Sequence, residues 1–366
     1  MRRCDGVAVV RDESGGMFVA LRDLRAARGR FLLITTVVLL VAVLVSFLSG
    51  LTAGLAHQNI SAVQGLRADQ VVFAETGADP SFDSSVLTEE QIARWRSTGG
   101  IEVTPVGISR TRAEHVGASP EQVALFGGDP AAFSNHPATA PGAVVLSSGA
   151  ARALAAGTGD TVVLAGHEFT VADVAGDEWY SHTPVIWTSM ADWQAASPRA
   201  GAATVLAVLG DAPRDDLDAE AGTRTLPAAN AVEAIGSYQA ENSSLTLMTV
   251  LLFAISALVI GAFFTVWTVQ RQPDIATLKA LGATTGSLAL DALAQAAIVL
   301  VTGVAIGLGS TAVASLFLGD AMPFVLSLST TLVPALALIA LGLVGAAVAL
   351  RFLFTTDPLT ALGATR

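Results

Sequence analysis

Long apolar runs, interrupted by one extended polar segment, dominate the pattern of this chain. A helix needs roughly 20 apolar residues to cross a bilayer, and four stretches meet that length. They predict transmembrane helices at 31–56, 242–270, 286–319 and 320–350. Asp291 and Asp320 are the only charged residues within them. A soluble fold would have to bury four such helices completely, so we interpret them as membrane spans.

The segment between the first two spans, residues 57–241, has a different pattern of short alternating runs and turn residues. Thr88 and Gln91 fit a capping box that opens a helix through Trp95. With 185 residues, the segment is long enough to form its own core. The runs predict a helix at 148–156 and strands at 70–74, 143–146, 161–164, 168–174, 185–187 and 203–209, with a hairpin joining 161–164 to 168–174.

Composition supports the same class of protein, because 52% of the residues are hydrophobic and only 14% are charged. The predicted fold class is an α-helical membrane protein with four transmembrane helices plus one extracellular α+β domain inserted between helices 1 and 2.

Basic residues predict the orientation of the spans through the positive-inside rule. They precede the first span, separate the second from the third, and follow the fourth, which places both termini in the cytoplasm. Residues 56–240 carry nine Arg and 22 Asp or Glu, a net charge of −13, which argues against binding of nucleic acid there. We predict a disordered tail at 1–16, a cytoplasmic amphipathic helix at 17–30 and a cytoplasmic tail at 351–366.

Motifs of catalysis and nucleotide binding are absent from the sequence. Lys279 is the only lysine and follows Leu278, so there is no phosphate-binding Gly-Lys-Ser/Thr loop. Cys4 is the only cysteine, and the five histidines show no metal-ligand spacing. We therefore expect no enzymatic activity, no metal and no intrinsic cofactor.

The polar stretch 271–285 between the second and third spans predicts a short cytoplasmic helix. Pro273 suits the first turn of a helix, and Gly282 suits a left-handed cap at its end. An apolar face with flanking charges would suit docking to another protein, whereas an ordinary connecting loop is the alternative. The residues expected to take part in docking are Asp274, Ile275, Leu278, Lys279, Leu281 and Gly282.

A second unusual stretch, residues 176–193, holds three of the five tryptophans together with Tyr180 and His182. Such aromatic residues can form a belt at the membrane interface, pack in a domain core, or line an apolar ligand site. Glu241 is the last carboxylate before the second span. It could stabilise the start of that helix through the dipole, or contact a ligand.

The run Arg-Gln-Pro-Asp-Ile-Ala-Thr-Leu-Lys-Ala-Leu-Gly-Ala-Thr at 271–284 closely resembles the coupling segment of MacB/FtsX-like permeases of ABC transporters. Asp274 stands where that family often has Glu. The basic run Leu-Arg-Asp-Leu-Arg at 21–25, the run Asp-Pro-Leu-Thr-Ala-Leu at 357–362 and the single outer domain agree with the resemblance. It implies a homodimer in the bacterial cell membrane. Two copies of a separate ATPase subunit would hydrolyse ATP and dock on 271–284.

The stretch Trp-Tyr-Ser-His-Thr-Pro-Val-Ile-Trp at 179–187 is similar to that of heme-exporter permeases from Gram-positive bacteria. The resemblance implies heme as the transported substrate, taken from the outer leaflet. Tyr180, His182 and Glu241 would then supply ligands to the iron and Phe47 would stack on the porphyrin. The alternatives are export of peptides, macrolides or lipoproteins, and transmission of force to an outer cell-wall hydrolase.

Overall fold

A computed structural model describes residues 28–115, 117–134, 140–197, 201–210, 214–318 and 322–354. The predicted tail at 1–16, most of the predicted helix at 17–30 and the run at 357–362 lie outside these ranges. The chain forms two compact units. The membrane unit contains the described residues up to 52 and from 247 onward, and the outer unit contains residues 53–246.

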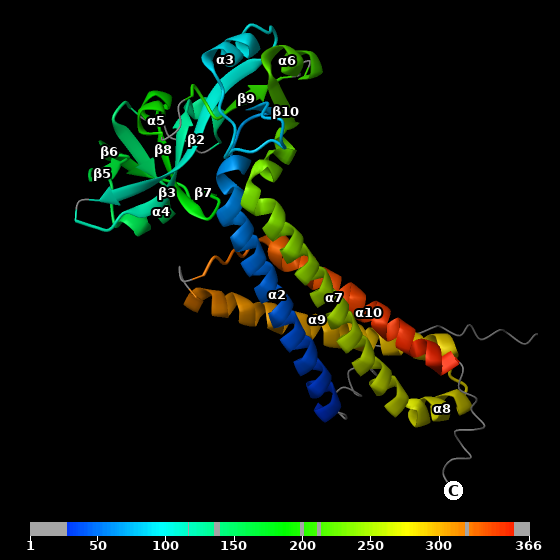
Figure 1. The fold of residues 1–366 in the computed structure, drawn as a ribbon. Helices are drawn as coiled ribbons and strands as arrows, with labels where there is room; N and C mark the ends of the chain where they lie inside the picture. The colour runs from blue at the N-terminus through cyan, green and yellow to red at the C-terminus, as the bar shows by residue number, and fades with distance from the viewer. Residues whose placement is uncertain are drawn as a thin grey trace, which may run out of the picture. The chain divides into compact units, whose positions relative to one another are not determined.

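Four long helices are long and apolar enough to cross a membrane, which confirms the predicted spans. They are α2 (Arg28–Gln64), α7 (Gly236–Gln270), α9 (Thr285–Leu318) and α10 (Leu328–Phe354) (Figure 1). The short α8 (Gln272–Ala280) connects α7 to α9. Both α2 and α7 continue past their predicted spans into the outer unit.

The fourth span was predicted to begin at 320, but the helix begins only at Leu328. Residues 322–327 are not helical. Pro323 has no N–H to donate within a helix, and Ser327 Oγ accepts from the backbone N of Thr330 at 3.1 Å, which starts the helix there. An apolar run alone could not show this break.

Close backbone contacts hold the membrane unit together. Gly303 and Gly307 of α9 lie against Val38 and Ala42 of α2, and a side chain at either glycine would collide with them. Small residues allow such close approach between helices in a membrane, where apolar burial gives little driving force. One turn further along, Ser46 and Thr311 of the same two helices share a hydrogen bond of 2.7 Å.

The outer unit is built on one sheet, in the order β10-β1-β9-β2-β3-β8-β4-β6-β5, with β7 paired to β8. Short helices α3 (Glu89–Arg96), α4 (Ser148–Leu154), α5 (Met190–Ala196) and α6 (Arg214–Ala221) and two 3-10 turns, η1 (Pro130–Ala132) and η2 (Ala228–Ala234), complete it. The strands are β1 (Gln70–Ala74), β2 (Glu102–His115), β3 (Glu121–Gly128), β4 (Ala143–Leu146), β5 (Thr161–Leu164), β6 (His167–Val174), β7 (Trp179–Tyr180), β8 (Thr183–Thr188), β9 (Val205–Leu209) and β10 (Thr223–Pro227).

The long strand β2 belongs to two parts of this sheet. Its first residues, 102–106, pair with β9 in an open sheet, and residues 106–113 pair with β3. Its last residues, 113–115, pair with β5, so that β2, β3, β8, β4, β6 and β5 close into a ring. The pairings β3–β8 and β4–β6 are parallel. The predicted α+β class is confirmed, although the 102–128 hairpin was not predicted.

Large aromatic side chains fill the core of the outer unit. Tyr180 is 1% exposed, and its ring lies edge-on to Phe126 at 5.6 Å and to Phe82 at 6.2 Å between centroids. In the part of the unit formed by the closed ring of strands, Trp193 of α5 covers Gly107 and Gly127, where any side chain would overlap it. Three interpretations were considered for the aromatic stretch 176–193. Packing in the domain core is the one that holds for Tyr180 and Trp193.

Candidate functional site

A tight turn between β7 and β8 carries the first elements of the candidate site. Ser181 and His182 form a two-residue hairpin loop, and both have left-handed backbones, with φ of 48° and 61°. This is the geometry of a type I′ turn, which non-glycine residues adopt at some cost. The backbone N–H groups of these two residues donate to the carbonyls of Asn59 and Gln58 in α2, both at 2.9 Å. The turn is thereby fixed against α2.

Side chains from three segments meet beside this turn in what we call the outer polar cluster: Asn59, Ser181, His182, Ser237 and Glu241. His182 Nε2 lies 2.9 Å from one carboxylate oxygen of Glu241 and 3.1 Å from the other. Asn59 Nδ2 donates to the same carboxylate at 3.0 Å, and Asn59 Oδ1 accepts from Ser237 Oγ at 2.9 Å. Each polar group in the cluster therefore has a partner.

Burial divides the cluster into a support and an accessible part. Asn59 is 1% exposed, whereas the side chains of His182 and Glu241 are 33% and 41% exposed. An imidazole nitrogen and a carboxylate can both bind a transition metal or receive a hydrogen bond from a polar ligand. The arrangement thus presents two ligand groups, held from behind by Asn59.

Of the four residues predicted to contact a substrate, the outer polar cluster contains His182 and Glu241. Tyr180 is 1% exposed in the domain core and is not part of the outer polar cluster. Phe47 belongs to the membrane unit, where its ring lies 5.4 Å from that of Phe324.

A second histidine–carboxylate contact involves His57, two residues before Asn59 on α2. His57 Nε2 is 2.8 Å from the carbonyl oxygen of Asp177 and 3.6 Å from its carboxylate. That carboxylate also accepts from Ser148 Oγ and Trp179 Nε1. Ser61 adds a further bond by accepting from the backbone N of Trp179 at 2.8 Å. Residues 57–61 of α2 are therefore fastened to 177–182 along their whole length.

Within the membrane unit, α8 corresponds to the predicted coupling helix, although it is shorter than the predicted range 271–285. Pro273 is in its first turn, and Gly282 after it has φ of 100°, as a left-handed cap requires. Leu278 and Leu281 are 43% and 80% exposed, while Ile275 is half-buried. An exposed apolar patch beside Lys279 is available to a partner. The side chain of Asp274 is outside the described part of the structure.

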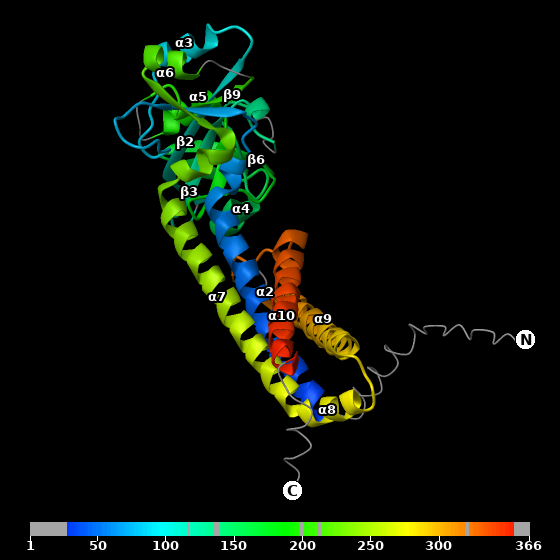
Figure 2. The same cartoon turned by 90° about the vertical axis from the view of Figure 1, so that its right-hand side faces the viewer.

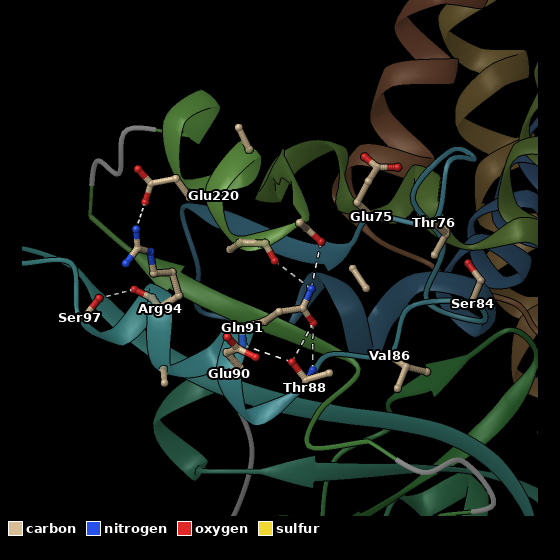
Figure 3. Close-up of a pocket in the computed structure, with 15 residues that line it drawn as sticks. Glu75, Thr76, Ser84, Val86, Thr88, Glu90, Gln91, Arg94, Ser97 and Glu220 are labelled. Carbon is tan, nitrogen blue, oxygen red and sulfur yellow. Dashed lines mark hydrogen bonds and ion pairs between the residues drawn. The ribbon is translucent and has the colours of Figure 1, made fainter.

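A groove in the outer unit lies between α3 and α6 and has a volume of about 1140 Å³ (Figure 3). Figure 3 shows Gln91 in its floor, donating to the carbonyls of Ala221 and Gly222 while its own oxygen accepts from Thr88. Arg94 is paired with Glu220 across one end. These polar groups are engaged within the domain, so the groove presents a solvated surface rather than a prepared ligand site.

Sequence reasoning missed the residues that support the candidate site. Asn59, Ser181 and Ser237 were not singled out, and neither was Gln295, which is 3% exposed on α9. A buried amide in an apolar helix is a signal that could have identified Asn59 and Gln295, because such a group needs a partner. Ser181 and Ser237 carry no such signal. In the part of the chain that the structure describes, no group of three His, Cys, Asp or Glu residues could hold a metal ion.

Family models match two adjoining parts of the chain. The model described as "MacB-like periplasmic core domain" matches residues 31–226, and the model described as "FtsX-like permease C-terminal" matches residues 246–358. The first covers more than half of the chain, and the second covers the helices that follow the outer unit.

Relatives of known description match over nearly their full length. A protein of Staphylococcus haemolyticus described as "Putative hemin transport system permease protein HrtB" is 27% identical over 95% of this chain and 99% of its own. A protein of Mycobacterium bovis described as "Uncharacterized ABC transporter permease Mb2592" is 25% identical with the same coverage.

Among solved structures, the periplasmic region of MacB from Actinobacillus actinomycetemcomitans matches with a TM-score of 0.36 and 14% identity, covering 48% of this chain and 95% of its own. On the two family models, which together span the membrane helices and the outer domain, the chain belongs to the MacB/FtsX-like family of ABC transporter permeases.

Proposed function

We propose that this permease exports heme, with His182 and Glu241 as the groups that receive the iron. The observation that carries the proposal is the contact between an imidazole nitrogen and a carboxylate, 2.9 Å apart and both partly exposed. Heme iron accepts nitrogen and oxygen ligands. The similarity to permeases described as hemin transport proteins, over 95% of the chain, agrees with this choice of substrate.

The proposed transport cycle uses two copies of this chain and two ATPase subunits. Both termini and α8 face the cytoplasm, where the ATPase subunits dock on Leu278 and Leu281. Heme enters from the outer leaflet and is bound through the outer polar cluster. ATP hydrolysis then drives the release of heme on the outer side. The alternative substrates, namely peptides, macrolides and lipoproteins, offer no iron and would not need a histidine–carboxylate pair.

Hemin titration of the purified full chain tests the substrate site. We expect a shift of the heme absorption band on binding, and an affinity about tenfold lower or more for Glu241→Gln and His182→Asn. Asparagine is chosen because it tolerates the left-handed backbone of residue 182. Glu233→Gln, at an exposed carboxylate in η2, is the matched control, and Tyr180→Phe should bind hemin like the wild type. Equal affinity of all variants would exclude this site.

Co-purification of the ATPase subunit tests the docking surface. Leu281→Asp places a charge on an 80% exposed leucine, so it should prevent docking without unfolding the membrane unit. Gly286→Asp is the control, because it adds the same charge outside 271–284, in the first turn of α9, where an added side chain meets no atom within 4 Å. Retention of the ATPase by Leu281→Asp would contradict docking at α8.

Transmission of force to an outer partner is a second candidate function. The observation that favours it is the continuous set of bonds between residues 57–61 of α2 and residues 177–182 of the outer unit. Such bonds make a helix and a domain move together. A permease that binds no hemin, and whose ATPase activity hemin does not stimulate, would support this second function.

A further inference from the structure

Arg271 forms the corner between α7 and α8 as a single connecting residue. Its backbone N–H donates to the carbonyls of Trp267 and Thr268, which ends α7, and its own carbonyl accepts from Ile275, which begins α8. Figures 1 and 2 both show α8 turning away from the axis of α7 at this point. With one residue at the corner, the direction of α8 is set by the conformation of Arg271.

The side chain of Arg271 is directed into the helix bundle and away from α8. Its Nη1 donates to Oε1 of Gln295 on α9 at 2.5 Å. Its guanidinium lies 5.2 Å from the centre of the Trp267 ring, a cation–π arrangement. An arginine at the cytoplasmic end of a span ordinarily extends its charged end toward water. Here the charge is half-buried between two side chains of the bundle instead.

Loss of the hydrogen bond between Arg271 and Gln295 would be unfavourable because Gln295 is buried. It is 3% exposed on a predominantly apolar helix, next to the fully buried Ala296. A buried amide oxygen without a donor is unfavourable, and a hydrogen bond from a charged donor is among the strongest available. Arg271 and Gln295 therefore hold the corner of α7 and α8 against α9.

Trp267 extends the contact to a further helix. Its indole is 6% exposed and lies edge-on to Phe31 at the start of α2, at 5.9 Å, and to Phe264, at 6.0 Å. The charged group of Arg271 thus joins α8 to α9 through Gln295, and to α2 through Trp267 and Phe31. We call these four residues, Phe31, Trp267, Arg271 and Gln295, the corner lock.

We propose that Arg271 is a positioning residue for energy coupling, which locks α8 to α9 and α2 so that movement of α8 is transmitted to both spans. This role rests on the proposed docking of the ATPase at α8. Without the lock, α8 still presents Leu278 and Leu281 to the ATPase, but it can pivot at the corner without moving α9. Docking and transmission are then separable properties of neighbouring residues.

The test uses the full chain with its ATPase subunit, a nitroxide label at the exposed Leu316 of α9, and Ser in place of Cys4. Distances between labels in the proposed dimer are compared without nucleotide and after trapping with ATP and vanadate. We expect the wild type to show a shift, and Arg271→Gln and Gln295→Leu to lose it while the ATPase still co-purifies. Gln295→Glu, which offers Arg271 a charged acceptor, should keep the shift.

Hemin transport in proteoliposomes gives a second measurement, and we expect it to fall about tenfold in Arg271→Gln, the effect of a typical coupling energy. Gln270→Leu, at the exposed neighbour of Arg271, is the matched control. A wild-type shift in Arg271→Gln or Gln295→Leu would overturn the lock, as would loss of the ATPase from either variant.

The change in distance between the nitroxide labels does not depend on which substrate is transported. A failure of the heme proposal would abolish hemin transport in the wild type and leave the label shift intact. A failure of docking would appear in Leu281→Asp, which would retain the ATPase.

Discussion

Residues 38–46 of α2 pack against α9 through the glycines at 303 and 307, whereas residues 57–61 of the same helix are held by hydrogen bonds to a hairpin turn. In the membrane unit the contact depends on small side chains, with a single hydrogen bond between Ser46 and Thr311 described in it. In the outer unit it depends on donors and acceptors placed opposite one another. One helix can use both because a lipid environment gives little driving force for apolar burial, while an aqueous edge allows polar groups to be paired without being fully desolvated.

The largest expected effect comes from closing the space that the glycines leave. In Gly307→Leu the new side chain would collide with Ala42, whose Cβ lies 2.7 Å from the position of the first added carbon. We expect a loss of about 3 kcal/mol in the free energy of unfolding of the membrane unit, as for a severe overpacking. Thermal unfolding of the full chain in detergent measures it.

Gly309→Leu is the matched control for that substitution, because no atom lies within 4 Å of the corresponding position and the residue is only two places further along α9. Equal melting temperatures for the two variants would show that α2 and α9 do not depend on their close approach.

An intermediate effect is expected when the buried amide of the outer polar cluster is removed. Asn59→Leu removes the donor to Glu241 and the acceptor for Ser237 while keeping the branched shape of the side chain. We expect a loss of about 1–2 kcal/mol, since the two partners are only partly buried and can recover some hydration. Gln64→Leu, at an exposed position near the end of the same helix, should be close to neutral. If Asn59→Leu and Gln64→Leu have the same melting temperature, the stability of the outer part of α2 does not depend on the Asn59 amide.

The smallest effect should come from the accessible contact of His57. In His57→Ala the carboxylate of Asp177 keeps its bonds to Ser148 and Trp179, and both partners in the lost contact are well exposed. Exposed pairs of this kind contribute less than about 1 kcal/mol and weaken in salt. Unfolding at low and high salt measures the difference. A loss as large as that of Asn59→Leu would show that the hydrogen bonds of residues 57–61 act as one unit.

Local patterns in the sequence were sufficient for the elements whose signals are short. The capping box of Thr88 and Gln91 forms as predicted, and the strand at 70–74 has its predicted bounds. The four apolar helices follow from length alone. The hairpin at 161–174 also forms, with its turn at Ala165 and Gly166.

The elements that were missed depend on contacts distant in the chain. Strands β2 and β3 contain Pro105, Gly107 and several charged residues, which break the alternation that identifies a strand. Gly107 is required there only because Trp193, 86 positions later, occupies its face. In the candidate site, the family resemblance placed His182 and Glu241 together, but their direct contact spans 59 residues and involves Asn59, which no local pattern indicated. The burial of Tyr180 could not be predicted, because it depends on Phe82 and Phe126, which are distant in the chain.

The strand β2 restricts how the outer domain can evolve or be engineered. Its 14 residues serve the open sheet at one end and the closed ring at the other, without a loop between them. Deleting a single residue at its centre would turn every later side chain of the strand to the opposite face, so that the ring would lose its interior while the sheet kept its own. The two halves of β2 therefore share one alternation of inward-facing and outward-facing positions. A chimera between related permeases should exchange both halves together, and new segments are better accommodated in the connections at the ends of the strands.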